Sequence, residues 1–363
     1  MSRLVYALLL IINCLFWPGT AGAAAEPSIT ATAAILMEAG TGQVLYEYGA
    51  REERPPASTT KIMTAILALE LGRPDTPVKV SSYAATTPGA SIYLTTGEIL
   101  TLGDLVKGAL LNSGNDATVA IAECLAGTEA GFAWLMNRKA RQIGAFHTHF
   151  NNPHGLTDPD HYTTAYDLAL MARYALDNPI FRRLVATQED QIPGPDGVRY
   201  LYNTNRLLGS YPGADGVKTG TTDAAGQCLV ASATRAGRRL IAVVLGSWDR
   251  YADARALLDY GFNDFYNETA PAGEPAGRVY VKNGKETSVP VAPLVTAGFT
   301  VPADQAAYLE KRVLLPAAVK APVRKGQELG QVKILFRGRE VAGSTLVATR
   351  DVAARPWWSR FKK

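Results

Sequence analysis

The chain has 363 residues, of which 47% are hydrophobic and 19% charged, and its formal net charge is +4. This composition is typical of a globular protein and excludes extensive disorder, a collagen-like repeat and a small disulfide-stapled scaffold. The length predicts about two domains, and the body of the chain has no Lys- and Arg-rich stripe of the kind that binds nucleic acid.

The first residues have the pattern of a secretory signal peptide, which we expect over residues 1–23. Arg3 precedes the apolar run 4–17, and Pro18, Gly19 and a series of small residues follow it. This order of charge, apolar core and small residues is typical of a cleaved leader. The apolar run is shorter than the ~20 residues that span a bilayer, which disfavours the alternative, a transmembrane anchor. We expect cleavage between residues 23 and 25 and a periplasmic or otherwise extracytoplasmic protein.

The cysteines and histidines do not predict a metal site. Cys14, Cys124 and Cys228 form no C-x-x-C pair, and Cys14 belongs to the leader. Cys124 and Cys228 could pair in an oxidising compartment, although two small buried side chains are the favoured interpretation. The four histidines have no acidic cluster beside them, so we expect no metal and no cofactor, and His154 is expected to be a structural hydrogen-bonding residue.

In chain order, the first predicted elements are a β-hairpin and a series of helices. Apolar runs at 33–38 and 44–48 flank a Gly-containing turn and predict the hairpin. Helix formers with a wide apolar face predict a helix over 58–71, and Gly72 ends it. Thr101-x-x-Asp104 resembles a capping box that starts a helix reaching residue 111. Further helices are expected over 116–126, 131–144 and 164–176.

After Gly216 the pattern changes to short β runs at 217–221, 227–234 and 240–247, followed by a helix over 251–264. Gly-containing turns between the runs predict an antiparallel meander. The two ends of this domain therefore form the sheet and the middle forms helices, which predicts an α+β fold with an inserted helical lobe.

A second, smaller domain is expected near the C-terminus. Pro and Gly residues predict a linker over 268–277, so the first domain is expected to span 24–267. Short β runs at 278–282, 313–315, 331–336 and 345–348 predict an all-β domain over 278–350, with one helical turn near 304–309.

Ser58 and Lys61 form a Ser-x-x-Lys motif at the start of the helix predicted over 58–71. Residues i and i+3 share a helix face, so Lys61 can lie against the Ser58 hydroxyl. A lysine can serve as the base for a serine nucleophile if its pKa is lowered. The motif alone is weak evidence, because Ser359-Arg-Phe-Lys362 has the same spacing at the chain end.

Two further triplets strengthen the hypothesis of a nucleophilic serine. Ser113-Gly114-Asn115 lies between two predicted helices and offers a second hydroxyl and an amide. Lys218-Thr219-Gly220 lies on the first run of the meander, where an extended peptide could add as a strand.

The three motifs, in this order on helix, loop and strand, resemble those of the penicillin-recognising serine enzymes. The chain is similar to the low-molecular-weight penicillin-binding proteins, the serine-type D-alanyl-D-alanine carboxypeptidases of the peptidase S11 family, from about residue 28 to the C-terminus. Asn152-Pro-His-Gly-Leu156 adds to the similarity. The resemblance implies a β-lactamase-like domain, an antiparallel sheet with helices on both faces, before the small β domain.

The resemblance also implies roles for the motif residues. Ser58 would attack the peptide bond between the two terminal D-alanines of a peptidoglycan stem peptide, and Lys61 would be the base. Ser113 would pass a proton to the leaving amine, and Asn115 would hold the substrate amide. The remaining roles concern electrostatics and binding: Lys218 would help to keep Lys61 neutral, Thr219 would bind the terminal carboxylate, Thr221 following Gly220 would complete an oxyanion hole with the Ser58 N–H, and Arg250 matches a carboxylate-binding arginine.

Two of these assignments are looser than the others. Thr221 stands where the family often has histidine, and Arg250 could equally be a surface residue at a helix start.

Other activities remain as alternatives. A D,D-endopeptidase cannot be separated from a carboxypeptidase by sequence. A class A β-lactamase needs a Glu-x-x-Asn pair, and no Glu in the chain has Asn three residues later, so we expect penicillin to acylate the protein and leave slowly. The complete motif set disfavours a non-catalytic wall-binding protein.

The tail over residues 351–363 is rich in Trp and in cations, a composition typical of the membrane interface. Four cations lie in the last nine residues, whereas residues 24–354 sum to −1. The basic charge of the chain is therefore concentrated at its ends, and we expect the tail to hold the protein peripherally on a membrane surface.

Overall fold

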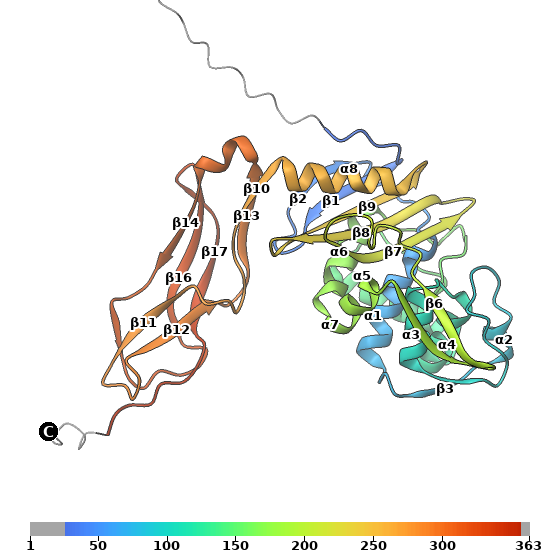
Figure 1. The fold of residues 1–363 in the computed structure, drawn as a ribbon, viewed down its shortest axis with the longest axis horizontal. Coiled ribbons are helices and arrows are strands. Elements are labelled where there is room, and N and C mark those ends of the chain that lie inside the picture. The colour runs from blue at the N-terminus through green and yellow to red at the C-terminus, as the bar shows by residue number, and fades with distance from the viewer. Residues whose placement is uncertain (1–25, 357–363) are drawn as a thin grey trace, which may run out of the picture.

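A five-stranded antiparallel sheet forms the centre of the first domain in the computed structural model, which describes residues 26–356 (Figure 1). Strands from the two ends of the domain build this sheet, as predicted. Its order is β2 (Val44–Tyr48), β1 (Ala33–Glu38), β9 (Arg238–Ser247), β8 (Gly226–Arg235) and β7 (Ala214–Thr222). Strand β7 is an edge strand, so one of its sides has no partner strand in this sheet.

Both faces of the sheet are buried. Successive side chains of each strand point to opposite sides, so each strand contributes to two cores. On β1, Ile35 and Met37 join the larger core under the helical lobe, whereas Leu36 joins a second core under α8 (Arg250–Asn263). The predicted antiparallel sheet with helices on both faces is therefore confirmed.

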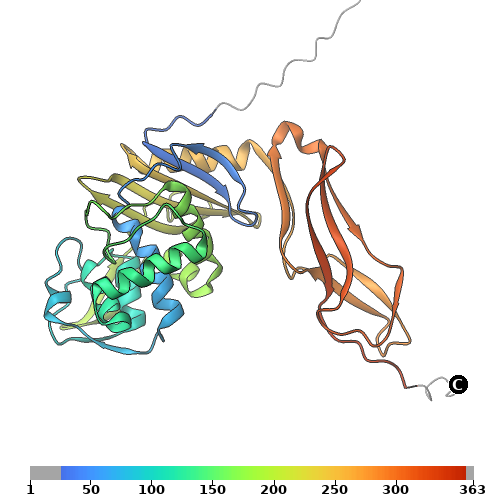
Figure 2. The same cartoon turned by 180° about the vertical axis from the view of Figure 1, so that it is seen from behind.

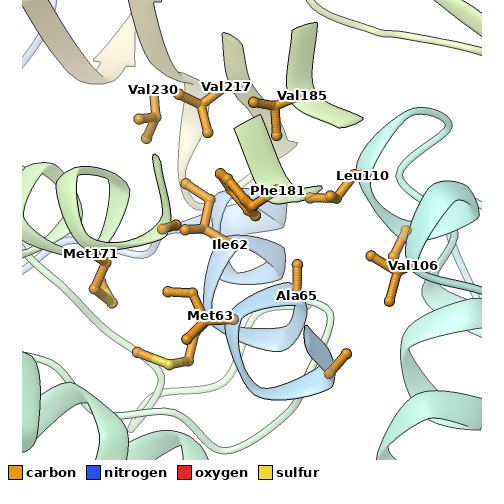
Figure 3. Close-up of a cluster of buried hydrophobic side chains, with 14 of the residues drawn as sticks. Ile62, Met63, Ala65, Val106, Leu110, Met171, Phe181, Val185, Val217 and Val230 are labelled. Atoms are coloured by element: carbon orange, nitrogen blue, oxygen red, sulfur yellow. The ribbon is translucent and has the colours of Figure 1, made fainter. Parts of the chain in front are cut away.

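Helix α1 (Lys61–Leu71) runs through the middle of the helical lobe, preceded by the 3₁₀ turn η1 (Ala57–Thr60). Residues 61–68 are buried in succession, as expected for a helix that is surrounded on all sides. Figure 3 shows Ile62 and Met63 on this helix, with Phe181 and the sheet residues Val217 and Val230 nearby. The other helices are α3 (Leu102–Leu110), α4 (Asn115–Ala126), α5 (Glu129–Ile143), α6 (Ala165–Asp177) and α7 (Pro179–Ala186).

The predicted cap of α3 is present: the Thr101 side chain accepts a hydrogen bond from the Asp104 N–H. Several short elements were not predicted. They are the helices α7 and α2 (Ser82–Ala85), the pair β3 (Pro77–Lys79) and β4 (Ile99–Thr101), and the hairpin of β5 (Glu189–Gly194) and β6 (Gly197–Tyr202). Apart from α7, which buries Phe181, Leu184 and Val185, these segments are short and bury few residues.

The second domain is an all-β body with one 3₁₀ segment, η2 (Ala303–Tyr308), which confirms the predicted fold class. The ladder of β10 (Phe265–Ala270) with β13 (Ala297–Pro302) was missed, and it takes residues 268–270 of the predicted linker into a strand. The larger sheet has the order β14 (Leu309–Leu314), β16 (Glu328–Phe336), β17 (Arg339–Ala348), β12 (Ser288–Pro293), β11 (Gly277–Lys282) and β15 (Ala318–Lys320).

Several connections join the domains at one end of the sheet. Helix α8 leads through Asp264 directly into β10, and the Gln43 side chain forms two hydrogen bonds with the Thr300 backbone, at 2.8 and 2.9 Å. Figure 2 shows the two bodies from behind, meeting near the end of α8. A hollow of about 1050 Å³ lies at this junction, lined by Arg173, Arg238 and Lys311 among others.

Cys124 and Cys228 do not form a disulfide: Cys228 is buried, whereas Cys124 is exposed on α4, contrary to the expectation of two buried side chains. Between residues 26 and 356, no single helix is long and apolar enough to cross a membrane, and the pair α4–α5 passes that test only when joined across a bend of 84°. The predicted signal peptide and residues 357–363 of the predicted tail lie outside the described residues.

Candidate active site

Ser58 and Lys61 lie together at the start of the central helix. Ser58 belongs to the 3₁₀ turn and Lys61 is the first residue of α1. The Lys61 side chain is completely buried, and its Nζ lies 2.8 Å from Ser58 Oγ, 2.7 Å from Asn115 Oδ1 and 2.8 Å from the His154 carbonyl oxygen. The spacing of the Ser-x-x-Lys motif therefore produces the predicted contact.

Burial, followed by the nearby positive charge of Lys218, lowers the pKa of Lys61 well below its ordinary value, although Asp116 acts in the opposite direction. A neutral amine has two N–H donors and one lone pair. The carbonyl oxygens of Asn115 and His154 accept the two donors, so the lone pair is left to accept the hydrogen bond of the Ser58 hydroxyl. This geometry suits a base that removes a proton from Ser58.

Asn115 is held from three directions in the break between α3 and α4. Its backbone N–H donates to the Ala90 carbonyl, and its Nδ2 donates to the Pro88 carbonyl, each at 2.7 Å. These bonds turn Oδ1 toward Lys61. Ser113, two residues earlier, is buried with a left-handed φ of 66°, and its hydroxyl makes no hydrogen bond within the described part of the chain. A strained backbone of this kind is frequent at functional sites.

Asp116 is a residue of this site that the sequence did not single out, although it directly follows Asn115. It is fully buried and accepts hydrogen bonds from Ser91 Oγ at 2.6 Å and from the backbone N–H groups of Ile92 and Leu94. These bonds fix the segment that supplies the Pro88 and Ala90 carbonyls to Asn115. Asp116 thus supports the site indirectly, by holding in place the backbone carbonyls that bind Asn115.

We expect Asp116→Ala to lower the free energy of unfolding of the catalytic domain by about 3 kcal/mol, because several buried donors lose a charged acceptor. Urea unfolding measures this change. Asp75→Ala, at an exposed aspartate, is the matched control and should leave stability nearly unchanged. Equal stability of the two variants would contradict the role given to Asp116.

Strand β7 brings the Lys218-Thr219-Gly220 motif to the same place. Gly220 lies against the serine: a Cβ added there would be 2.9 Å from the Ser58 nitrogen and 3.1 Å from the Pro56 carbonyl oxygen. Any side chain at this position would therefore crowd the Ser58 N–H. Lys218 is buried, and its pKa is lowered to about 7 by burial and by the charge of Arg250. Its positive charge is present below about pH 7 and is lost above it.

Arg250 is fixed at the N-terminus of α8, facing β7 and β8. Its guanidinium donates to Thr221 Oγ1 at 2.8 Å, to the Gly220 carbonyl at 2.7 Å and to Gln227 Oε1 at 3.1 Å. Arg250 therefore lies against the end of the Lys218-Thr219-Gly220 motif and is not an unattached surface residue. Thr219 is joined on its other side to Thr204, with 2.6 Å between the two hydroxyl oxygens. Gln227 and Thr204 were not predicted.

The histidines act as structural hydrogen-bonding groups around this site. His154 contributes its backbone carbonyl to Lys61, and its Nδ1 accepts from the Leu156 N–H. His161 accepts from the Asn151 N–H at Nδ1 and faces Thr60 Oγ1 with Nε2, and burial lowers its pKa to about 3. Within residues 26–356, no group of three or more His, Cys, Asp or Glu side chains could hold a metal ion.

The comparisons with known proteins cover nearly the whole chain. Residues 20–248 match the model of the peptidase S11 family, D-alanyl-D-alanine carboxypeptidase, and residues 266–354 match the C-terminal domain of penicillin-binding protein 5. The chain is 38% identical to D-alanyl-D-alanine carboxypeptidase DacF of Bacillus subtilis, with 100% of both chains covered. It is 33% identical to D-alanyl-D-alanine carboxypeptidase DacC of Escherichia coli, covering 92% of this chain and 87% of the relative.

The structure is also similar to solved structures. Penicillin-binding protein 5 from Haemophilus influenzae aligns with a TM-score of 0.71 and 30% identity, covering 91% of this chain and 99% of the other. DacD from Francisella tularensis aligns with a TM-score of 0.68 and 32% identity, covering 91% and 95%. Together with the serine and lysine at the start of α1, these similarities show that the chain belongs to the peptidase S11 family and is a serine-type D-alanyl-D-alanine carboxypeptidase.

Proposed function

We propose that Ser58 is the nucleophile with which this enzyme removes the terminal D-alanine from peptidoglycan stem peptides. The observation that carries this assignment is the buried Lys61 amine, whose Nζ lies 2.8 Å from Ser58 Oγ while two carbonyl oxygens accept its other hydrogen bonds. Enzymes of the family act on the D-Ala-D-Ala end of peptidoglycan peptides and bind β-lactams.

The proposed reaction has two steps. Lys61 takes the hydroxyl proton as Ser58 Oγ attacks the carbonyl carbon of the penultimate D-alanine. The backbone N–H groups of Ser58 and Thr221 stabilise the oxyanion, a kind of contribution worth ~10²–10³ in rate per donor. The C–N bond then breaks, Ser113 relays the proton held by Lys61 to the leaving amine nitrogen so that both residues regain their starting states, and D-alanine departs. Water hydrolyses the acyl-enzyme and restores the Ser58 hydroxyl.

The terminal carboxylate of the substrate is proposed to bind between β7 and α8. Thr219 offers a hydroxyl at the edge of the sheet, and Lys218 and Arg250 supply positive charge on either side of it. Asn115 is proposed to hold the backbone amide of the substrate on the opposite side of Ser58. An extended peptide would thus lie along the open edge of β7.

A single incubation tests this function. The mature protein is mixed with a diacyl-L-Lys-D-Ala-D-Ala peptide or with penicillin, and both reactions are followed by mass spectrometry. D-alanine release together with a long-lived penicillin adduct on the peptide that contains Ser58 is the expected result. Rapid turnover of penicillin would instead indicate a β-lactamase, and the lack of any adduct or product would indicate a binding protein.

We expect Arg250→Gln to lower kcat/KM for the peptide about 30-fold, because a charge-assisted contact with the carboxylate is lost. A substrate whose C-terminal carboxylate is converted to an amide is the control. Its slower hydrolysis should be nearly the same in wild type and variant. If the variant lowers both activities equally, Arg250 supports β7 and does not recognise the carboxylate.

We also propose that the enzyme is extracytoplasmic and lies on the membrane through its C-terminal tail. The cations and tryptophans of residues 351–363 support this proposal. Sedimentation of the mature chain with anionic vesicles should fall sharply when residues 357–363 are removed, and neutral vesicles serve as the control.

A further inference from the structure

The hairpin of β5 and β6 has one face that is fully exposed beside the candidate site. Its outward positions alternate with inward ones along both strands, so that Val198, Tyr200 and Tyr202 point to the same side. Their cross-strand partners on this face are Pro193, Gln191 and Glu189. The side chains of Tyr200 and Tyr202 are 64% and 60% exposed, which leaves two aromatic rings side by side in water.

The opposite face holds the hairpin firmly on the helical lobe. Ile192 and Leu201 are buried in the larger core, and Arg199 forms an ion pair with Glu98 at 3.0 Å. Arg199 also donates to the Tyr93 carbonyl at 3.1 Å. The two exposed tyrosines therefore stand on a fixed backbone. Exposed apolar patches of this kind are frequently binding sites.

Hydrogen bonds connect the end of this hairpin to both sides of the candidate active site. The Tyr202 N–H donates to the Oδ1 of Asn112 at 2.6 Å, and Asn112 is the residue directly before Ser113. Two residues after Tyr202, Thr204 Oγ1 lies 2.6 Å from Thr219 Oγ1, on the strand proposed to hold the substrate carboxylate. The end of the hairpin is thus joined to segments on both sides of the candidate active site, next to Ser113 and to Thr219.

A hollow of about 610 Å³ lies at the foot of the hairpin, lined by Tyr202, Glu189, Gln188, Asn203 and Arg206 among others. Gln188, Glu189 and Arg206 are exposed, and their side chains make no hydrogen bond or ion pair within the described part of the chain. The hollow therefore offers free hydrogen-bonding groups at the end of the aromatic face.

We propose that this face, Tyr200 and Tyr202 with the hollow below them, binds the glycan strand of polymeric peptidoglycan. The inference rests on the proposed function, since it extends the same substrate beyond its peptide. Aromatic rings present an apolar surface with a polar tip, and the amide of Gln191 and the groups of the hollow can bond to hydroxyl and N-acetyl oxygens. From Val198 to Tyr202 the face is about 13 Å long, enough for a short oligosaccharide.

The charge of the face favours a sugar over a stem peptide. The six outward positions of the hairpin hold one carboxylate, Glu189, and no cation. With Arg206 of the hollow, the site has no net charge, which suits neutral N-acetylated sugars and gives no net attraction to the carboxylates of stem peptides. The single cation of the hollow, Arg206, is placed to donate to oxygen atoms beside Tyr202.

The double variant Tyr200→Ala with Tyr202→Ala tests the proposal. The side chains are exposed and the Tyr202 backbone bond to Asn112 is kept, so the fold should be unaffected. We expect kcat/KM on uncross-linked polymeric peptidoglycan to fall ~10-fold, and kcat/KM on the free pentapeptide to stay within about twofold. Tyr48→Ala is the matched control. Tyr48 is 55% exposed on β2, the edge strand of the five-stranded sheet that lies opposite β7.

A second measurement uses peptide-free glycan oligosaccharides. They should inhibit hydrolysis of the polymer by the wild type and have little effect on the double variant. Unchanged polymer hydrolysis in the double variant would overturn the proposal, and so would an equal loss on the free pentapeptide. An equal loss on a glycan-free cross-linked peptide would assign the face to peptide instead. Failure of the wild type to release D-alanine from the free pentapeptide would overturn the proposed function itself.

Discussion

Ser58→Ala is expected to abolish D-alanine release and penicillin adduct formation together, with a loss of kcat of ~10⁴-fold or more. Both reactions are proposed to need the same Oγ atom, because no other nucleophile lies beside the Lys61 amine among the described residues. Replacing Ser58 by alanine should not strain β7, because Gly220 lies against the Ser58 backbone nitrogen and not against its hydroxyl. D-alanine release and intact-protein mass after incubation with penicillin measure the two losses.

The chain supplies its own control for this variant. Ser359 begins a second Ser-x-x-Lys motif, which ends at Lys362. Ser359→Ala should leave both activities at the wild-type level. An adduct that persists in Ser58→Ala would show that the nucleophile had been assigned to the wrong residue.

Lys61→Met is expected to lower kcat/KM ~10³-fold, the size typical of losing a general base. The variant keeps the volume of the buried side chain and removes the amine. In the wild type, burial and Lys218 depress the pKa of Lys61, so the amine is neutral at higher pH and gains a proton as the pH falls. Wild-type kcat/KM should therefore decline on the acid side, and the residual activity of Lys61→Met should lack that decline.

Lys139→Met is the matched control for the loss of a mostly buried amine. Its Nζ pairs with Glu70 away from the serine, at 2.5 Å, and the variant should keep the wild-type pH profile. If the acid decline remains in Lys61→Met, the group that titrates is another residue and Lys61 has a different role.

The sequence predicted those parts of the fold whose apolar pattern was long and regular. The runs at 33–38 and 44–48 coincide with β1 and β2, and the helix expected over 164–176 lies within one residue of α6. The hairpin of β5 and β6 was missed because its outward face carries Val198, Tyr200 and Tyr202, so its alternation of apolar and polar residues is blurred. Strand β10 was missed because its pairing with β13 is a tertiary event that residues 265–270 alone do not indicate.

The site was predictable as motifs but not as a network. The contact of Lys61 with Ser58 follows from the motif spacing, whereas the hydrogen bond between Lys61 and Asn115 was not predicted. The third partner of Lys61 is the backbone carbonyl of His154. Every residue has a backbone carbonyl, so the sequence does not indicate which one will meet the lysine. Asp116 could have been noticed as a carboxylate next to the motif, although its partners at 91–94 depend on how the loop folds back.

The junction of the two domains limits how they can move. The chain itself joins them where α8 ends and β10 begins, and the Gln43 amide ties the β1–β2 turn to Thr300 at a second point. Arg238 on β9 adds a further contact, a hydrogen bond to the Phe265 carbonyl at 3.2 Å. The β domain would therefore act as a braced strut, and loss of the Gln43 amide would leave the remaining attachments close to the end of α8.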